Sequence, residues 1–185
     1  MGNVVILMPN ESELRMRRVC FTGHRPEKLN KSESEIVASL EREIRAAITD
    51  GFQTFISGMA RGVDIWAAEV VLRLRDNGSP IHLIAASPYQ GFERAWSPAW
   101  QHRYASALVG ADIVRFISPQ YDRGCFQRRN EWMVDHAGRV IAVFNGEKGG
   151  TKNTIDYADR VRYNIFRKNK KEPKRYRHAH KTLVE

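Results

Sequence analysis

Cysteine is scarce in this 185-residue chain, and long apolar runs are absent. The two cysteines, Cys20 and Cys125, stand far apart, which excludes a disulfide framework and a cysteine-based zinc site. No run approaches the roughly 20 apolar residues that cross a bilayer, and the apolar stretch at residues 4–8 has neither a basic leader nor a small-residue cleavage site beside it. These absences predict a cytoplasmic protein with no membrane partner.

Common catalytic and cofactor motifs are missing as well. The chain has no G-x-G-x-x-G dinucleotide fingerprint, no G-x-x-x-x-G-K-[ST] P-loop and no G-x-S-x-G nucleophile elbow. Its six histidines form no H-x-x-x-H pair that could hold a metal ion. The sequence therefore predicts no metal site and no cofactor.

Positive charge is in excess, and it gathers near the C-terminus. The formal net charge is +9, and residues 160–181 contain a single acidic residue, Glu172. Such a basic segment favours polyanions such as nucleic acid through counterion release, but charge runs are also common in solvated termini. We expect residues 1–16 to be a leader that could add a strand, residues 17–166 to be the folded domain and residues 167–185 to be a basic tail.

Apolar runs rich in β-formers alternate with helical patterns along the domain. Ile36, Leu40, Ile44 and Ile48 recur every four residues, and Ser32 with Glu35 matches a helix capping box. Strands are expected at residues 18–22, 52–57, 81–86, 113–117 and 139–144, with a short sixth at 163–166. Helices are expected at residues 32–50, 63–77, 125–137 and 151–161, and over most of 92–109. This alternation predicts an α/β, Rossmann-like three-layer sandwich with a mostly parallel sheet of about five to six strands and helices on both faces.

The segments that follow parallel strands meet at one edge of such a sheet, and ligands bind there. The polar and glycine-rich segments of this chain fall at those positions: residues 23–26, 57–64, 87–91, 118–123 and 146–154. We therefore expect the ligand site at the carboxyl edge of the sheet.

The segment Ser57–Asp64 (SGMARGVD) joins an expected strand to an expected helix. Gly58 and Gly62 permit positive φ and the close approach of a ligand to the backbone, while the helix N-terminus favours an anion. Arg61 can bind phosphate through two parallel hydrogen bonds. Ser57 belongs to the same turn, and Asp64 could cap the helix or accept a ribose hydroxyl. The alternative is a plain turn with a surface arginine.

A second glycine-rich turn follows the fifth expected strand. Gly149 and Gly150 precede Thr151 and Thr154 at the start of a helix, so backbone amides and hydroxyls could cradle a phosphate. The alternative is a hairpin-like turn.

The first expected strand ends in the polar sequence Thr22-Gly23-His24-Arg25-Pro26. Gly23, His24 and Arg25 suit contacts to a phosphate or a base. His24 could also transfer protons near neutral pH, although a lone histidine is more often a positioned hydrogen-bonding residue.

Aromatic and polar residues could complete this rim. Tyr89 and Trp96 could stack a nucleobase, but the four-residue spacing of Trp96, Trp100 and Tyr104 equally fits a packed helix face. Asn130 and Glu131, near the start of another helix, could reach the rim or serve as capping and surface residues.

The segment SGMARGVDIWAAE resembles the signature of the SLOG superfamily, which unites the Smf/DprA DNA-processing proteins with the LOG cytokinin-activating enzymes. Together with TGHRP and GGTKNT, it is most similar to the YpsA-like branch over roughly residues 18–166. The resemblance implies a Rossmann-like fold that binds a nucleotide or a nucleotide-derived ligand as a sensor or regulatory module. It leaves open whether the chain forms a homo-oligomer.

The resemblance also suggests two alternatives. LOG-type phosphoribohydrolases carry PGGxGTxxE with a catalytic glutamate; here Gly149 and Gly150 match, Lys152 and Asn153 depart, and Asp156 replaces the glutamate. As an enzyme, the chain would therefore hydrolyse the N-glycosidic bond of a nucleoside 5'-monophosphate with Asp156 as the acid–base group. The second alternative is DprA-like binding of single-stranded nucleic acid through the rim and the basic tail.

Overall fold

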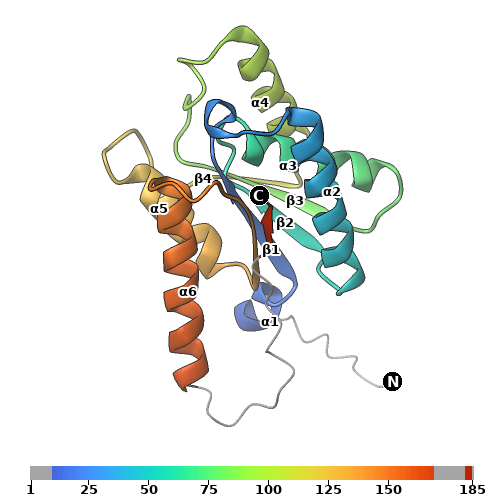
Figure 1. Cartoon of the computed structure of the whole chain (residues 1–185), viewed down its shortest axis with the longest axis vertical. Coiled ribbons are helices and arrows are strands. Elements are labelled where there is room, and N and C mark those ends of the chain that lie inside the picture. The colour runs from blue at the N-terminus through green and yellow to red at the C-terminus, as the bar shows by residue number, and fades with distance from the viewer. Residues whose placement is uncertain (1–9, 169–181, 185) are drawn as a thin grey trace, which may run out of the picture.

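The computed structural model describes residues 10–168 and 182–184, and within them a parallel sheet is covered on both faces (Figure 1). The strands lie in the order β4-β3-β2-β1-β5-β6, each parallel to its neighbours. Their bounds are β1 Arg18–Gly23, β2 Thr54–Ser57, β3 His82–Ser87, β4 Ile113–Phe116, β5 Arg139–Val143 and β6 Thr182–Val184. This confirms the predicted Rossmann-like fold.

Two sets of helices complete the three layers. In Figure 1, α5 and α6 lie on one side of the sheet, while α2 and α3 lie on the other. A short helix, α1, precedes β1, and one turn of 3-10 helix, η1, follows it. The bounds are α1 Glu11–Arg15, η1 Pro26–Lys28, α2 Glu33–Thr49, α3 Val63–Asp76, α4 Pro98–Gly110, α5 Cys125–Asp135 and α6 Gly150–Lys168. None of the helices in the described ranges is long and apolar enough to cross a bilayer.

The strands divide their side chains between the two helix layers because successive residues point to opposite faces. Val19 and Phe21 of β1 pack with α2, α3 and α4, whereas Cys20 packs on the other side with Met133 of α5 and Ala158 of α6. The same strand is therefore apolar on both faces, as expected for a central strand of a parallel sheet.

The expected start of α2 is confirmed in atomic detail. The Ser32 hydroxyl accepts from the Glu35 amide at 3.3 Å, and the Glu35 carboxylate accepts from the Ser32 amide at 2.9 Å. This reciprocal pair satisfies two amides that lack a partner within the helix. Ile36, Leu40 and Ile44 are buried along one face of that helix.

Two sequence-based element predictions are wrong. Residues 163–166 lie inside α6 rather than in a strand, because a short apolar run is compatible with either structure. The sixth strand is instead Thr182–Val184, within the expected basic tail, and it pairs with β5. The helix expected from residue 92 begins only at Pro98, whose fixed φ suits a first helical position. Of the leader, Glu11–Arg15 is helical, and the suggested strand at residues 4–8 lies outside the described residues.

Candidate functional site

The turns that follow β1, β4 and β5 gather at one end of the sheet, the upper end in Figure 1. Strand β1 is central: the chain adds β2, β3 and β4 on one side of it and then crosses to place β5 on the other. The amide of His24 donates to the carbonyl of Val143 at 3.3 Å, so the turns after β1 and β5 begin side by side. Ligands of open α/β sheets bind at such a switch in strand order.

The turn between β2 and α3 leaves several donors at the start of a helix. Helix α3 has no side-chain cap, and in the described part of the chain the amides of Arg61, Gly62 and Val63 donate to no protein acceptor. Gly62 has φ +96°, and a Cβ there would lie 2.7 Å from Cδ of Pro26. Glycine is therefore required both by the backbone conformation and by the approach of the preceding loop. The result is an uncapped helix N-terminus, a position at which backbone amides and the helix dipole favour an anion.

A buried ion pair between α5 and α3 stabilises this turn. Nη1 of Arg129, on α5, lies 3.4 Å from Oδ2 of Asp64, and Asp64 also accepts from the Ala60 amide at 3.2 Å. Burial raises the pKa of the Asp64 carboxyl, while Arg129 opposes that effect. Burial likewise lowers the pKa of the Arg129 guanidinium, while Asp64 opposes it. The sequence analysis predicted that Asp64 caps the helix or accepts a ribose hydroxyl; in the structure its carboxyl is buried against Arg129 and the Ala60 amide.

The predicted residues Ser57 and Gly58 also stabilise the turn between β2 and α3. The Ser57 hydroxyl donates to the Asp64 carbonyl at 2.7 Å and accepts from the Met59 amide at 3.1 Å. The Gly58 carbonyl accepts a hydrogen bond from Nη1 of Arg129, and a Cβ on Gly58 would overlap that guanidinium. Both residues therefore fix the shape of the turn.

Arg61 stands at the mouth of the turn, in contact with the loop after β1. Its Nη2 lies 2.6 Å from Oε1 of Glu27, and its side chain is 31% exposed. The neighbouring Lys28 pairs with Glu147 at 3.3 Å, and its carbonyl accepts from the Asn145 amide group at 2.8 Å. These bonds tie the loops after β1 and β5 to each other and to Arg61. An anion that reaches Arg61 must compete with Glu27.

The three predicted residues after β1 differ in their surroundings. Gly23 packs against α3, because a Cβ there would lie 2.5 Å from Cβ of Val63. His24 is buried, stacks on Phe144 with ring centroids 5.4 Å apart, and its Nε2 has no hydrogen-bond partner among the described residues. Burial and the charge of Lys28 lower the pKa of His24. Arg25 is exposed at the rim.

The first turn of α6, directly after the glycine-rich turn, holds two buried threonines. Thr151 and Thr154 are 6% and 1% exposed, and the Thr154 hydroxyl donates to the Gly150 carbonyl at 2.8 Å. That hydroxyl is therefore engaged within the helix. A Cβ on Gly150 would lie 4.0 Å from the side-chain nitrogen of Asn130, so the structure brings Asn130 to this turn. Gly149 is exposed beside it.

Asp156 lies farther along α6, outside the turn. Its Oδ2 lies 2.6 Å from Nζ of Lys152, four residues earlier, and both side chains are largely exposed. It lines an open hollow of about 470 Å³ between α5 and α6 with Gln127, Asn153 and Arg160. The Asp156 carboxylate is thus engaged by Lys152 on the surface of α6.

The remaining rim predictions separate into packed and accessible residues. Trp96 contacts Phe92 and Tyr104 edge-on, with ring centroids 4.9 and 5.6 Å apart, so it belongs largely to the packing of this region. Tyr89 lies among several aromatic rings at the rim. Glu131 accepts a hydrogen bond from Gln127 at 2.9 Å on the surface of α5.

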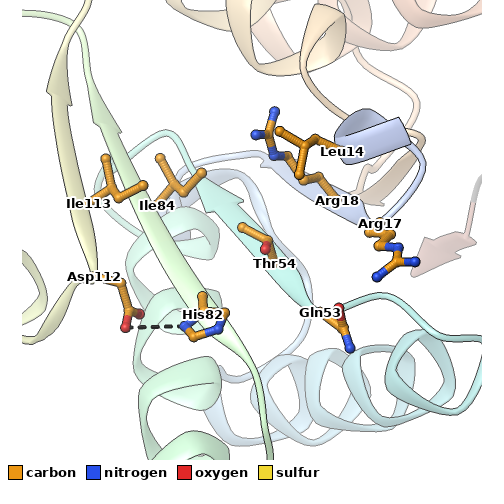
Figure 2. Close-up of a pocket in the computed structure, with 9 residues that line it drawn as sticks. All are labelled: Leu14, Arg17, Arg18, Gln53, Thr54, His82, Ile84, Asp112 and Ile113. Atoms are coloured by element: carbon orange, nitrogen blue, oxygen red, sulfur yellow. Dashed lines mark hydrogen bonds and ion pairs between the residues drawn. The ribbon is translucent and has the colours of Figure 1, made fainter. Parts of the chain in front are cut away.

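A second hollow of about 270 Å³ lies at the opposite, amino edge of the sheet (Figure 2). Its one carboxylate, Asp112, is 3.3 Å from Nδ1 of His82, 3.1 Å from Arg75, and accepts from the Leu83 amide at 2.7 Å. The hydrogen-bonding capacity of the Asp112 carboxylate is therefore used by groups of the protein itself. The hollow also lies away from the edge where parallel sheets bind ligands.

Arg129 is the main site residue that the sequence analysis missed. Cys125, Arg129 and Met133 recur at four-residue spacing and are all buried on α5. An arginine on an otherwise apolar stripe requires a buried partner, because unpaired buried charge is costly. That pattern was the available signal, but it does not say that the partner is Asp64.

The family model described as the YspA SLOG family matches residues 19–176 of this chain. The UPF0398 protein ABC2016 of Shouchella clausii is 34% identical over 116 residues, which cover 61% of this chain and 62% of that protein. The SPbeta prophage-derived protein YoqJ of Bacillus subtilis is 30% identical over 119 residues, covering 58% of this chain and 70% of YoqJ.

Two solved structures of DNA processing protein A have the same fold. The Streptococcus pneumoniae protein superposes with a TM-score of 0.57 at 20% identity, over 80% of this chain and 48% of that one. The Helicobacter pylori protein, described with a single-stranded DNA binding mode, superposes with a TM-score of 0.55 at 21% identity, over 82% of this chain and 64% of that one. This chain thus spans about half of the pneumococcal protein.

Proposed function

This chain belongs to the YspA SLOG family, and we propose that it binds the phosphate of a nucleotide or nucleotide-derived ligand on the turn between β2 and α3. The observation that carries the proposal is the uncapped start of α3, where the amides of Arg61, Gly62 and Val63 have no protein acceptor in the described ranges. Three such amides at a helix N-terminus can donate hydrogen bonds to the oxygens of a phosphate.

The ion pair beneath the turn gives it a fixed shape. Arg129 and Asp64 come from α5 and α3 and hold the Gly58 carbonyl and the Ala60 amide. A donor set that is already in place loses little conformational entropy when a ligand binds. Arg61 adds a charged donor once it leaves Glu27. The site is thus suited to recognition of an anion, as in a sensor or regulatory module.

Binding is favoured over hydrolysis because of the position of Asp156. The hydrolase alternative gives the acid–base role to this residue, whose carboxylate is paired with Lys152 and faces the hollow between α5 and α6. Single-stranded nucleic acid is the second candidate. It is supported by the H. pylori structure, whose description names that ligand, and by the exposed Arg25 and Arg123 on the rim.

Titration calorimetry with AMP, ADP, ADP-ribose and inorganic phosphate tests the proposal. Arg61→Ala should weaken binding by roughly 10- to 100-fold, because a hydrogen bond to a charged group contributes about 1.5–3 kcal/mol. The matched control is Arg73→Ala, which removes another arginine that is paired with a glutamate, here Glu41 at 2.9 Å, at the far end of α3. The control should bind as the wild type does.

Two results would overturn the proposal. One is that none of these phosphates binds the wild-type protein at millimolar concentration. The other is that Arg61→Ala and Arg73→Ala bind with equal affinity, which would place any binding elsewhere on this basic chain.

A further inference from the structure

We propose that four aromatic side chains beside the phosphate turn form a shelf that stacks the nucleobase of the ligand. This aromatic shelf consists of Tyr89 and Phe92 from the segment after β3, Tyr121 from the loop after β4, and Phe126 from the first turn of α5. The inference rests on the proposed function, because it assigns the base-binding part of the same site.

The four rings form one continuous cluster. Tyr89 contacts Phe92, Tyr121 and Phe126 with centroid distances of 5.7, 5.7 and 6.3 Å. Phe126 closes the cluster at 5.5 Å from Phe92 and 6.2 Å from Tyr121. The rings meet edge-on or tilted, with interplanar angles between 56° and 70°. Each ring is thus held by its neighbours in the geometry that aromatic pairs prefer.

The outer part of the shelf is open to solvent. Tyr121 is 59% exposed and Phe126 is 37% exposed, whereas Tyr89 and Phe92 are half-buried behind them. Large aromatic side chains that gather on a surface generally mark a binding site rather than a packing requirement. A planar base can stack on such a surface whatever its hydrogen-bonding edge.

Helix α5 connects the shelf to the phosphate turn. Phe126 and Arg129 are three residues apart on that helix, so their side chains lie on the same face one turn apart. Arg129 contacts the Gly58 carbonyl and the Asp64 carboxylate in the turn. A phosphate on the turn and a base on the shelf would therefore lie on adjacent parts of one rim, as the two ends of a nucleotide require.

The charge around the shelf matches a phosphorylated ligand. Arg94 and Arg123 are exposed and have no ion-pair partner among the described residues, while Arg128 is paired with Asp122. Glu93 is only half-exposed, and its Oε2 is buried. Aromatic faces flanked by arginines suit a nucleotide or a single strand, whose phosphates lie beside stacked bases.

The test compares AMP with ribose 5-phosphate, which has the phosphate and sugar but lacks the base. Tyr121→Ala and Phe126→Ala should each weaken AMP binding by roughly 5- to 100-fold, because base–aromatic stacking contributes about 1–3 kcal/mol. Binding of ribose 5-phosphate should stay unchanged. Tyr121→Phe should retain AMP affinity, since the ring remains. Val109→Ala, at an 88% exposed apolar residue of α4, is the matched control.

A parallel titration with a tetranucleotide of deoxyadenosine distinguishes a free nucleotide from a strand. If the shelf variants lose affinity for AMP or for the tetranucleotide but not for ribose 5-phosphate, the result supports the shelf. The probe whose affinity falls shows whether the base comes from a free nucleotide or from a strand. The shelf is overturned if the wild type binds AMP and ribose 5-phosphate with equal affinity and the shelf variants bind the tetranucleotide as the wild type does. That result leaves the phosphate site standing. If Tyr121→Ala instead dissociates a dimer in sedimentation without altering base-dependent affinity, the shelf is a self-association surface and the inference fails. Absence of binding by all three probes defeats the phosphate site as well.

Discussion

Nη1 of Arg129 and Oδ2 of Asp64 lie 3.4 Å apart between α5 and α3, and both side chains are more than nine-tenths buried. The two residues are 65 positions apart in the sequence, yet together they fix the turn that presents the amides of α3. This pair joins the two helix layers of the molecule around the end of β2. Its integrity decides whether the candidate site keeps its shape.

Removing one member of this pair should destabilise the protein strongly. Arg129→Met or Asp64→Asn is expected to lower the free energy of unfolding by about 3–5 kcal/mol, because the partner is left buried without compensation. The double variant should recover part of that loss. Urea unfolding at pH 7 measures the effect. The control is Arg128→Met, in an exposed pair with Asp122, which should change the stability far less because solvent screens that pair. Equal losses for Arg128→Met and Arg129→Met would contradict this account.

Gly62 should tolerate a side chain less well than another glycine of similar φ. Gly62 and Gly78 have nearly equal φ angles, +96° and +95°, but a Cβ at Gly78 meets nothing within 4 Å. Gly62 also has ψ −125°, and only glycine adopts this combination of angles readily. Alanine at Gly78 should cost about 1–2 kcal/mol because of its positive φ. Gly62→Ala should cost about 1–3 kcal/mol more, because its backbone angles are less accessible to alanine and its Cβ would overlap Pro26. Thermal unfolding of both variants checks this, and equal midpoints would contradict both causes.

Glu27 should act as an internal competitor for the ligand phosphate. Its carboxylate occupies Arg61 at 2.6 Å, so Glu27→Gln is expected to tighten AMP binding by up to about 5-fold, the range of an exposed ion pair. Calorimetric titration measures the change. Glu147→Gln removes one negative charge from the same rim without touching Arg61, since Glu147 pairs with Lys28. A gain of the same size in both variants would mean that net charge, not release of Arg61, is responsible.

His24 should make stability depend on pH on the acidic side of neutrality. Burial, followed by the charge of Lys28, lowers the pKa of His24 below its ordinary 6.5, while Glu147 and Asn145 act in the opposite direction. The unfolded chain therefore binds the proton more readily than the folded one, and stability present above pH 6.5 is lost as pH falls towards the folded pKa. His24→Phe, which keeps the ring on Phe144, should flatten that loss between pH 5.5 and 7.5 in urea unfolding. A variant profile parallel to the wild type would exclude His24 as its source.

Much of the fold could be predicted from local sequence patterns. Apolar periodicity located α2 and α3, and the Ser32–Glu35 capping box marked the start of α2. The helix predicted from residue 92 began at Pro98 instead, because its aromatic spacing resembled a helix face while the chain formed turns. The strand expected at residues 163–166 is helical for a related reason: a short apolar run fits both periodicities.

The candidate site was predictable as a set of turns but not as a set of contacts. Gly62 was expected to serve the backbone, and its positive φ confirms that expectation. Gly23 was predicted to contact a ligand, and the structure adds that its missing side chain makes room for Val63. Arg61 was expected to be available, but the structure pairs it with Glu27. These contacts join distant segments, so no local pattern could identify the partners.

The sequence by itself determined the alternation of strands and helices, the carboxyl-edge position of the glycine-rich turns and the family resemblance, because propensity, periodicity and turn chemistry are local. The tertiary structure alone decided that Arg129 meets Asp64, that Tyr121 and Phe126 join one aromatic cluster, and that Thr182–Val184 completes the sheet beside β5. Each of these depends on which strand lies beside which, and strand order follows from the packing of the whole chain rather than from any one segment.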